Sequence, residues 1–307
     1  MRRRPDVTLT QLRYFVKAAT YLSMTKAADE LHIAQSAVSA AISQLEQQIG
    51  TQLFIRQRAR GLALTAAGED MLRDTRALLA HLDEVIDGAS GHVDQVRGTV
   101  RLACFVTLTP FVLPRLLSEL GARYPDLEVE VIETSADAVP TVLRNGTAEL
   151  ALTYDLALDG GVEVEHLGVA APYVALAADH RLAGRKNIRL TELADEPMVM
   201  LDLPDSREYF EGILAKVGVT PRIRYRSASY ETVRGLVARG HGFSILNQIP
   251  AHPGTYGGGL VSTVGIRDEL PGLPVVLARL QSVRPTARAR AVAAATRAVF
   301  ADQDLRR

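Results

Sequence analysis

The sequence has no tryptophan, a single cysteine and no long apolar run. Because Cys104 has no partner in the chain, it cannot form an internal disulfide, and zinc sites built on paired cysteines are excluded. No stretch approaches the roughly 18 consecutive apolar residues of a membrane-spanning helix. The first residues are three arginines followed by Pro5, with no apolar segment of the kind that directs secretion. We therefore expect a soluble cytoplasmic protein with no membrane partner.

The sequence motifs of the common enzyme classes are also missing. The chain contains no nucleotide loop of the form GxGxxG or GxxxxGKS/T, no GxSxG and no HExxH. Its seven histidines are scattered without metal-ligand spacing. Cys104 lies in an apolar segment, where a buried thiol is inert, although redox sensing stays open as an alternative. These absences predict a protein that is not an enzyme and that holds no catalytic residue, cofactor or metal.

Charge is balanced over the whole chain but not along it. The 307 residues, enough for about two domains, carry 35 basic and 35 acidic side chains. Residues 1–65 hold nine of the basic and four of the acidic side chains, so this segment has a net charge of +5 and the remainder −5. A basic segment attached to an acidic body points to a nucleic-acid or membrane partner for that segment.

Apolar periodicity predicts three helices in the basic segment. The first is capped by Thr10 and ends at Tyr21, the second spans 24–32, and the third spans 36–48. Two short helices joined by a three-residue turn form a helix-turn-helix.

The outer face of the third helix is short, polar and free of carboxylates before Glu46. Such a surface can approach phosphates and base edges without repulsion, whereas an ordinary solvated helix, the alternative, would mix in more lysine and glutamate. The outward residues are Gln35, Ser36, Ser39, Ala40, Ser43 and Gln47.

A β-hairpin is expected after the third helix. Two short apolar strands, 53–56 and 62–65, flank a tip that carries Arg58 and Arg60, with Gly61 free to take a positive φ. The segment therefore predicts a winged helix-turn-helix, and two arginines at the tip suit phosphate or minor-groove contact. The alternative is a hairpin that is merely solvated.

Residues 9–72 resemble the N-terminal domain of the LysR-type transcriptional regulators. One position departs from the family pattern: Ala40 stands where the family often has a long polar side chain, which removes one base contact. The matching positions are Leu12-Arg13-Tyr14-Phe15, Ala27-Ala28 with Leu31, Gln35-Ser36 with Ser39, Leu45-Glu46, Gly50, Leu53-Phe54 with Arg56, and Leu64-Thr65 with Gly68.

Double-stranded promoter DNA is the partner that this resemblance implies, with RNA polymerase as a further candidate. The polar face of the third helix would enter the major groove, and the wing arginines would hold phosphate or the minor groove. The residues expected to contact DNA are Thr25, Gln35, Ser36, Ser39, Ser43, Arg56, Arg58 and Arg60.

A long helix is expected from Thr65 to about Ala89. Its seam residues recur at alternating steps of four and three, as in a coiled coil, and no second helix of similar pattern follows nearby. The alternative is that this stripe packs on the protein's own body. The linker helix of LysR-type regulators dimerises, so the resemblance implies a homodimer or homotetramer. Met71, Leu78, Leu82 and Val85 would then form the dimer contact, with Thr75 in the same seam.

Strands and helices alternate over the carboxy-terminal two thirds, which predicts mostly parallel sheets in two lobes joined by crossing strands. The segments LADEP (193–197) and GHGFS (240–244) resemble the LysR-type effector domain, which is itself similar to periplasmic binding proteins. The expected fold is α/β overall, with a winged helix-turn-helix, a helical linker and a two-lobed effector-binding domain. The expected boundaries are 8–65, 66–90 and 98–304, with lobe I at about 98–168 and 272–304 and lobe II at about 169–271.

The cleft between the lobes is expected to bind a small anionic effector. Strand ends and helix N-termini collect there, and their N–H groups and positive dipole ends favour anions. Serine or threonine before a helix is also an ordinary cap, and Arg207 could either pair with a carboxylate or lie in solvent. The candidate effector-binding residues are Thr107, Thr109, Ser135, Thr153, Arg207 and Ser229.

A free-standing solute-binding protein is the main rival interpretation, because the body alone would suit it. Such a protein would need a secretory signal and would have no use for a basic winged helix. The basic segment therefore favours a homo-oligomeric DNA-binding regulator that responds to a small metabolite.

Overall fold

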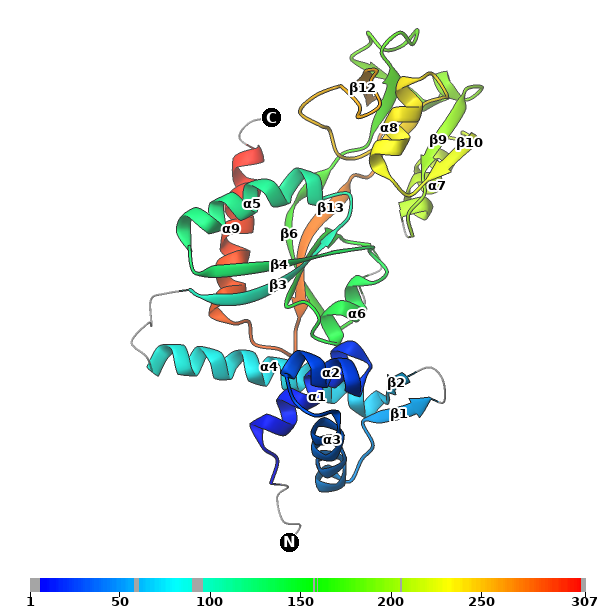
Figure 1. The fold of residues 1–307 in the computed structure, drawn as a ribbon. Helices are drawn as coiled ribbons and strands as arrows, with labels where there is room; N and C mark the ends of the chain where they lie inside the picture. Colours follow the sequence, from blue (N-terminus) through cyan, green and yellow to red (C-terminus); the bar gives the residue numbers. More distant parts are fainter. Residues whose placement is uncertain are drawn as a thin grey trace. The chain divides into compact units, whose positions relative to one another are not determined.

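The structure is a computed structural model that describes residues 6–57, 61–89, 96–156, 158, 160–204 and 206–304. Contacts divide the chain into two units (Figure 1). The N-terminal unit contains the residues up to 95 together with 142–147, and the C-terminal unit contains 96–141 and 148–307. Each unit has a hydrophobic core of its own.

The N-terminal unit begins with three helices, α1 (Leu9–Tyr21), α2 (Met24–Leu31) and α3 (Gln35–Ile49). Phe15, Val38 and Leu45 are fully buried between them, because the apolar residues of each helix recur on one face. Phe15 also meets Phe54 edge to face, with ring centroids 5.6 Å apart, which ties α1 to the segment after α3.

The first helix is capped by Thr8, so the prediction of a Thr10 cap is wrong. The Thr8 hydroxyl accepts the Gln11 N–H at 3.2 Å, and the Gln11 side-chain oxygen accepts the Thr8 N–H at 2.9 Å. This reciprocal pair is a capping box. Thr10 lies inside the helix.

The hairpin and the long helix follow, as β1 (Phe54–Gln57), β2 (Gly61–Leu64) and α4 (Ala66–Ala89). The two strands pair antiparallel. Thr65 caps α4, since its hydroxyl accepts the Gly68 N–H at 2.9 Å. A Cβ at Gly68 would overlap the carbonyl oxygen of Leu53, so a glycine lets the start of α4 lie this close to the hairpin.

The first sheet of the C-terminal unit contains β3 (Gly98–Phe105), β4 (Leu127–Thr134), β5 (Leu150–Tyr154), β6 (Val162–Ala170) and β13 (Leu273–Leu280). Its spatial order is β4-β3-β5-β13-β6. The short helix α6 (Val139–Arg144) spans the boundary between the two units, because its residues from Val142 onward are counted with the N-terminal unit. The helices α5 (Thr109–Arg123) and α9 (Ala287–Asp304) belong with the sheet, and α9 packs on α5, β3 and β6. We call this assembly lobe I.

The remaining elements of the unit form lobe II (Figure 1). Its strands are β7 (Tyr173–Ala177), β8 (Asn187–Ile188), β9 (Pro197–Leu201), β10 (Arg222–Ser227), β11 (Ser244–Leu246) and β12 (Val261–Ile266). Four of them form a sheet in the order β11-β7-β12-β8, and β9 pairs with β10. The helices are η1 (Leu190–Leu193), α7 (Ser206–Lys216) and α8 (Tyr230–Ala238).

The four-stranded sheet and the five-stranded sheet each contain both parallel and antiparallel strand pairs. The expectation of mostly parallel sheets is therefore wrong. β3 runs parallel to β4 and β5, but β13 runs antiparallel to β5 and β6. In lobe II, β7 runs antiparallel to β11 and β12. The alternation of apolar residues does not predict the strands β6, β8 and β12. The direction in which two strands pair is set by how the connecting chain brings the second strand back to the sheet, and the local sequence pattern does not contain that information.

The two lobes share one continuous core. The chain crosses between them at Ala170–Tyr173 and again between Ile266 and Leu273. Leu102 of lobe I and Phe243 of lobe II belong to the same cluster of buried apolar residues. Within the described part of the chain, every helix is too short or too polar to cross a bilayer.

Candidate DNA-binding surface and effector cleft

The outer face of α3 is open to solvent. Ser36, Ser43 and Gln35 are exposed and Ser39 is half-buried, while Thr25 is exposed on α2. The opposite face of α3 is anchored because its apolar residues are buried in the core of the unit. The structure therefore places the five polar candidates on accessible helical surface.

The N-terminus of α3 carries no side-chain cap. Ala34 occupies the cap position and supplies no hydrogen bond from its side chain. Among the described residues, the N–H groups of Gln35 and Ser36 are left for solvent or for a ligand, whereas the Ala37 N–H donates to the Ala34 carbonyl at 3.0 Å. The positive end of the helix dipole lies at this turn. A phosphate group is well suited to such a position.

Glu46 is the single carboxylate in the sequence of α3, and the structure assigns it an internal task. Its Oε1 accepts the Leu53 N–H at 2.7 Å and the Phe54 N–H at 3.1 Å. The carboxylate thereby fixes the start of the hairpin against α3. Sequence reasoning missed this role because the two amides lie seven and eight residues further along the chain.

One of the three candidate wing arginines lies in the described part of the hairpin. Arg56 lies in β1, where it pairs with Leu62 of β2. Arg58 and Arg60 lie outside the described residues.

The seam of α4 divides into two parts. Met71 packs against the core of the N-terminal unit and Thr75 is buried, so this end agrees with the alternative of packing on the protein's own body. Further along, Leu78 is 51% exposed and Val85 67%, while Leu82 is half-buried. The second half of α4 therefore presents apolar side chains that this chain alone leaves in water.

The first turns of α5 and α8 meet across the two lobes. Phe111 of α5 and Tyr230 of α8 contact edge to face, with ring centroids 5.6 Å apart and planes at 85°. Gln248 donates from its side-chain amide to the Tyr154 hydroxyl at 2.9 Å, which joins lobe II to β5 of lobe I. Thr107 is buried beside that hydroxyl.

Tyrosine hydroxyls gather around Gln248. Tyr173 donates to the Gln248 carbonyl at 2.9 Å, and Tyr230 donates to the same oxygen. Burial raises the pKa of Tyr154 and of Tyr173 to about 12, and it also raises the pKa of Tyr230. The hydroxyls of Tyr173 and Tyr230 therefore act as hydrogen-bond donors, while the Tyr154 hydroxyl accepts from Gln248. Sequence reasoning missed the cluster because its members lie up to 94 residues apart.

The threonine candidates lie on lobe I. Thr153 is fully buried in β5, and its hydroxyl has no hydrogen-bond partner among the described residues. Thr109 donates to the Phe105 carbonyl at 3.3 Å, which ties the first residue of α5 back to β3. Ser135 is half-buried just after β4.

The two remaining candidates have structural partners within lobe II. Ser229 caps α8 by accepting the Thr232 N–H at 3.2 Å, as the capping alternative states. Arg207 donates to an Asp202 carboxylate oxygen at 2.5 Å, and its side chain is 53% exposed. This ion pair on accessible surface agrees with the solvent alternative for Arg207. Among the described residues, no three His, Cys, Asp or Glu side chains gather closely enough to hold a metal ion.

Two protein-family models match the chain. The model of the bacterial regulatory helix-turn-helix protein of the lysR family matches residues 9–69, and the LysR substrate binding domain matches residues 94–301. Similar curated proteins include the uncharacterized HTH-type transcriptional regulators YnfL of Escherichia coli K12 and YvbU of Bacillus subtilis 168. YnfL is 33% identical over 247 residues (78% of this chain, 82% of that protein), and YvbU is 30% identical over 243 residues (79% and 82%).

Solved structures match nearly the whole chain as well. HinK, a LysR family transcriptional regulator from Pseudomonas aeruginosa, is 33% identical, covers 96% of this chain and 99% of its own, and superimposes with a TM-score of 0.66. A full-length OxyR from the same organism is 21% identical over 96% of this chain and 98% of its own, and its TM-score of 0.73 shows a shared fold.

Proposed function

Because the chain belongs to the LysR family of transcriptional regulators, we propose that it is a cytoplasmic homodimer or homotetramer that couples a small anionic effector to promoter DNA. Membership of this family means that the chain is a DNA-binding regulator with an effector-binding domain and not an enzyme. It also confirms the resemblance drawn from the sequence. The further parts of the proposal are the DNA contacts, the oligomer, and the place and charge of the effector.

The DNA contact is assigned to the exposed face of α3. Ser36, Ser39 and Ser43, with Gln35, would meet base edges in the major groove, because short polar side chains can both donate and accept there. The uncapped N-terminus of α3 would hold a backbone phosphate. This accessible, carboxylate-free face within a matched helix-turn-helix is the observation that carries the proposal. Thr25 and the wing residues Arg56, Arg58 and Arg60 would add contacts around it.

The oligomer is assigned to the second half of α4. Leu78 and Val85 lie seven residues apart, at the same position of two successive heptads, and both are exposed, as seam residues would be in a single chain. Met71 and Leu82 would complete the contact. Pairing two such helices would fix the spacing of two recognition helices on DNA.

The effector is assigned to the cleft where α5 and α8 meet. The Phe111–Tyr230 contact brings two helix N-termini together, and their positive dipole ends favour a negative charge on the ligand. Hydroxyl partners for the effector would come from Thr107, Thr153 and the nearby tyrosines. The rim of the cleft would hold Thr109, Ser135 and Ser229. Arg207 is the candidate with the least support. A ligand that binds one lobe arrangement more tightly than another would shift the subunit arrangement, and hence DNA affinity.

Operator binding is tested by titrating the purified chain against its own upstream intergenic DNA and against random DNA. We expect specific affinity that falls about a thousandfold between roughly 50 and 200 mM salt, because basic groups displace counterions from phosphates. Fluorescence anisotropy at several salt concentrations measures this slope. Equal affinity for both DNAs over the whole salt range, with and without the effectors described next, would contradict the proposed readout.

The charge of the effector is tested by thermal unfolding with small mono- and dicarboxylates. Each acid is compared with the alcohol in which the carboxylate is replaced by a hydroxymethyl group. We expect at least one acid to raise the melting temperature of the native chain while its alcohol does not, since a ligand that binds the folded state stabilises it. Thr107→Val should weaken that acid about tenfold through loss of a buried hydroxyl. Stabilisation by the alcohols alone would overturn the anionic assignment.

A further inference from the structure

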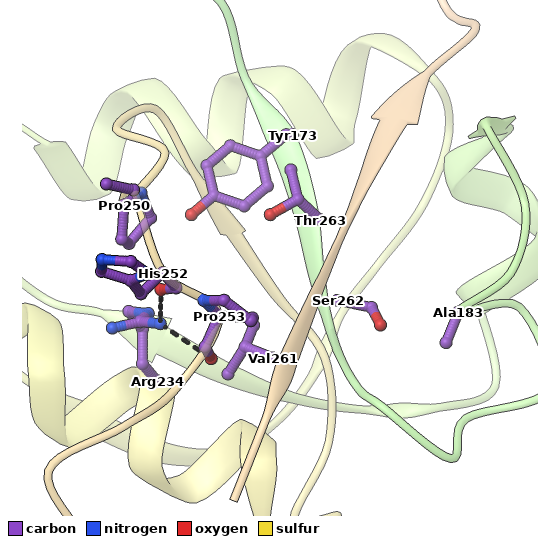
Figure 2. A pocket seen from close by; sticks show the side chains of 10 residues that line it. Tyr173, Ala183, Arg234, Pro250, His252, Pro253, Val261, Ser262 and Thr263 are labelled. Carbon is purple, nitrogen blue, oxygen red and sulfur yellow. Dashed lines mark hydrogen bonds between the residues drawn. The ribbon is translucent and has the colours of Figure 1, made fainter.

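Lobe II contains a cavity of about 320 Å³ that none of the sequence-predicted residues line. It lies between the loop 250–253 and β12, with Tyr173 of β7 and Ala183 also on its wall. Figure 2 shows Tyr173 and Thr263 beside one another, with Pro250, His252 and Arg234 on one side and Ala183 on the other. Tyr173 belongs both to this wall and to the cluster of hydroxyls around Gln248.

One edge of β12 is open inside this cavity. Along a strand, successive residues turn their N–H and C=O groups to opposite edges. The carbonyl of Leu260 points toward β7, where it accepts the Ala178 N–H. The N–H and C=O groups of Val261, Thr263 and Gly265 therefore point to the opposite edge of β12.

Two of those three residues already have partners on that edge. The Val261 N–H donates to the Pro253 carbonyl at 3.0 Å, and the Gly265 N–H donates to the Lys186 carbonyl at 3.0 Å. Thr263 lies between them, and no described residue forms a hydrogen bond with its N–H or its carbonyl. The open stretch is therefore a single residue, closed on one side by the loop 250–253 and on the other by the start of β8.

The wall of the cavity is preorganised and electrically balanced. Arg234 is buried and donates to the carbonyls of His252, Pro253 and Gly254, at 3.3, 3.1 and 3.0 Å, which holds the loop in place. Its charge is matched by Glu231, whose carboxylate accepts from it at 2.8 Å. Among the described residues that line the wall, Arg234 is the only Lys, Arg, Asp or Glu side chain, so the cavity favours an uncharged ligand.

We propose that this notch in the edge of β12 binds one extended amino-acid unit of a small ligand that is uncharged at both ends, such as an N-acylated amino-acid amide. An isolated trans amide points its N–H and C=O in opposite directions and cannot satisfy both groups of Thr263. An extended residue presents its own N–H and C=O on the same side, as in the hydrogen-bonded pairs of an antiparallel ladder. The ligand N–H donates to the Thr263 carbonyl, and the ligand carbonyl accepts the Thr263 N–H.

The size of the cavity selects a small molecule rather than a peptide strand. From Val261 to Gly265 the strand extends about 13 Å at roughly 3.3 Å per residue, and both ends are already paired. The volume lies at the lower limit of ordinary ligand pockets. Pro250, Pro253 and Val261 leave room for a short apolar side chain.

The probe is N-acetyl-alanine N-methylamide, observed by saturation-transfer NMR with the full chain. We expect saturable binding with a dissociation constant on the order of millimolar, which is ordinary for a ligand of about ten non-hydrogen atoms. The matched compound carries a methyl group on the alanine nitrogen and so lacks the donating N–H. It should bind about tenfold more weakly.

Two variants locate the binding. Thr263→Pro removes the N–H that faces the cavity and leaves the ladder with β7 intact, so affinity for the probe should fall about tenfold. Thr263→Val keeps the backbone groups and should bind as the wild-type chain does. Equal binding of the two compounds, unchanged affinity in a folded Thr263→Pro chain, or no saturable binding of the probe would each overturn the proposal. If Thr263→Pro does not fold, the comparison of the two compounds on the wild-type chain decides alone.

Discussion

Replacing both Leu78 and Val85 with lysine is expected to leave the protein monomeric and to weaken operator binding at least about a hundredfold. The two side chains are 51% and 67% exposed in the single chain, so the substitutions should disturb its own fold little. In a paired helix the same positions would be buried, and four lysines facing one another across the seam would be desolvated and would repel. The loss in DNA affinity follows because two linked DNA-binding units bind far more tightly than one.

Sedimentation velocity and operator titration measure the two effects on the same preparation. Asp83→Lys is the matched control, since this exposed residue of α4 lies on the side of the helix away from Val85, two positions along. It should remain oligomeric and bind the operator normally. A double variant that sediments like the wild-type chain would show that the assembly is held by another surface.

Placing carboxylates on α3, with Ser36→Asp and Ser43→Glu together, is expected to reduce operator binding by at least about a hundredfold without unfolding the protein. Both serines are exposed, so neither substitution buries a charge. An aspartate in the first turn of α3 also interacts favourably with the helix dipole, which compensates for any lost local stability. At the surface of DNA the same carboxylates would face phosphates and carbonyl acceptors, where they repel.

The control is Ala122→Glu, which adds one of the two negative charges at an exposed position of α5 in the C-terminal unit. It should bind DNA as the wild-type chain does, while all variants should unfold at nearly the same temperature by circular dichroism. Operator titration at one salt concentration compares the affinities. Binding by the double variant within a factor of about two of wild type would remove the face of α3 from the DNA contact.

The three helices of the N-terminal unit and the buried face of α3 could be predicted from sequence. Because Val38 and Leu45 recur on one face of α3 and are buried, Ser36 and Ser43 must point outward, and they do. The cap of α1 was misplaced because more than one threonine precedes the periodic residues. Only the reciprocal bond with Gln11 selects Thr8.

The candidate effector cleft could be placed only roughly. Helix starts identified Thr107, which lies beside the Tyr154 hydroxyl, but they also selected Ser229, which serves as a cap. Gln248 and Tyr154, which join the lobes there, carry no local signal because they are 94 residues apart.

Sequence periodicity by itself determined which face of α3 is buried and which is polar and exposed, and where the apolar stripe of α4 runs, because that information repeats within a few residues. Tertiary structure alone decided the antiparallel pairing of β13, the gathering of hydroxyls at Gln248 and the open edge at Thr263. Each of these depends on which distant segment supplies the partner. The Thr263 notch exists only because its two neighbours along the edge find carbonyls in separate loops, a coincidence of long-range contacts that no local pattern encodes.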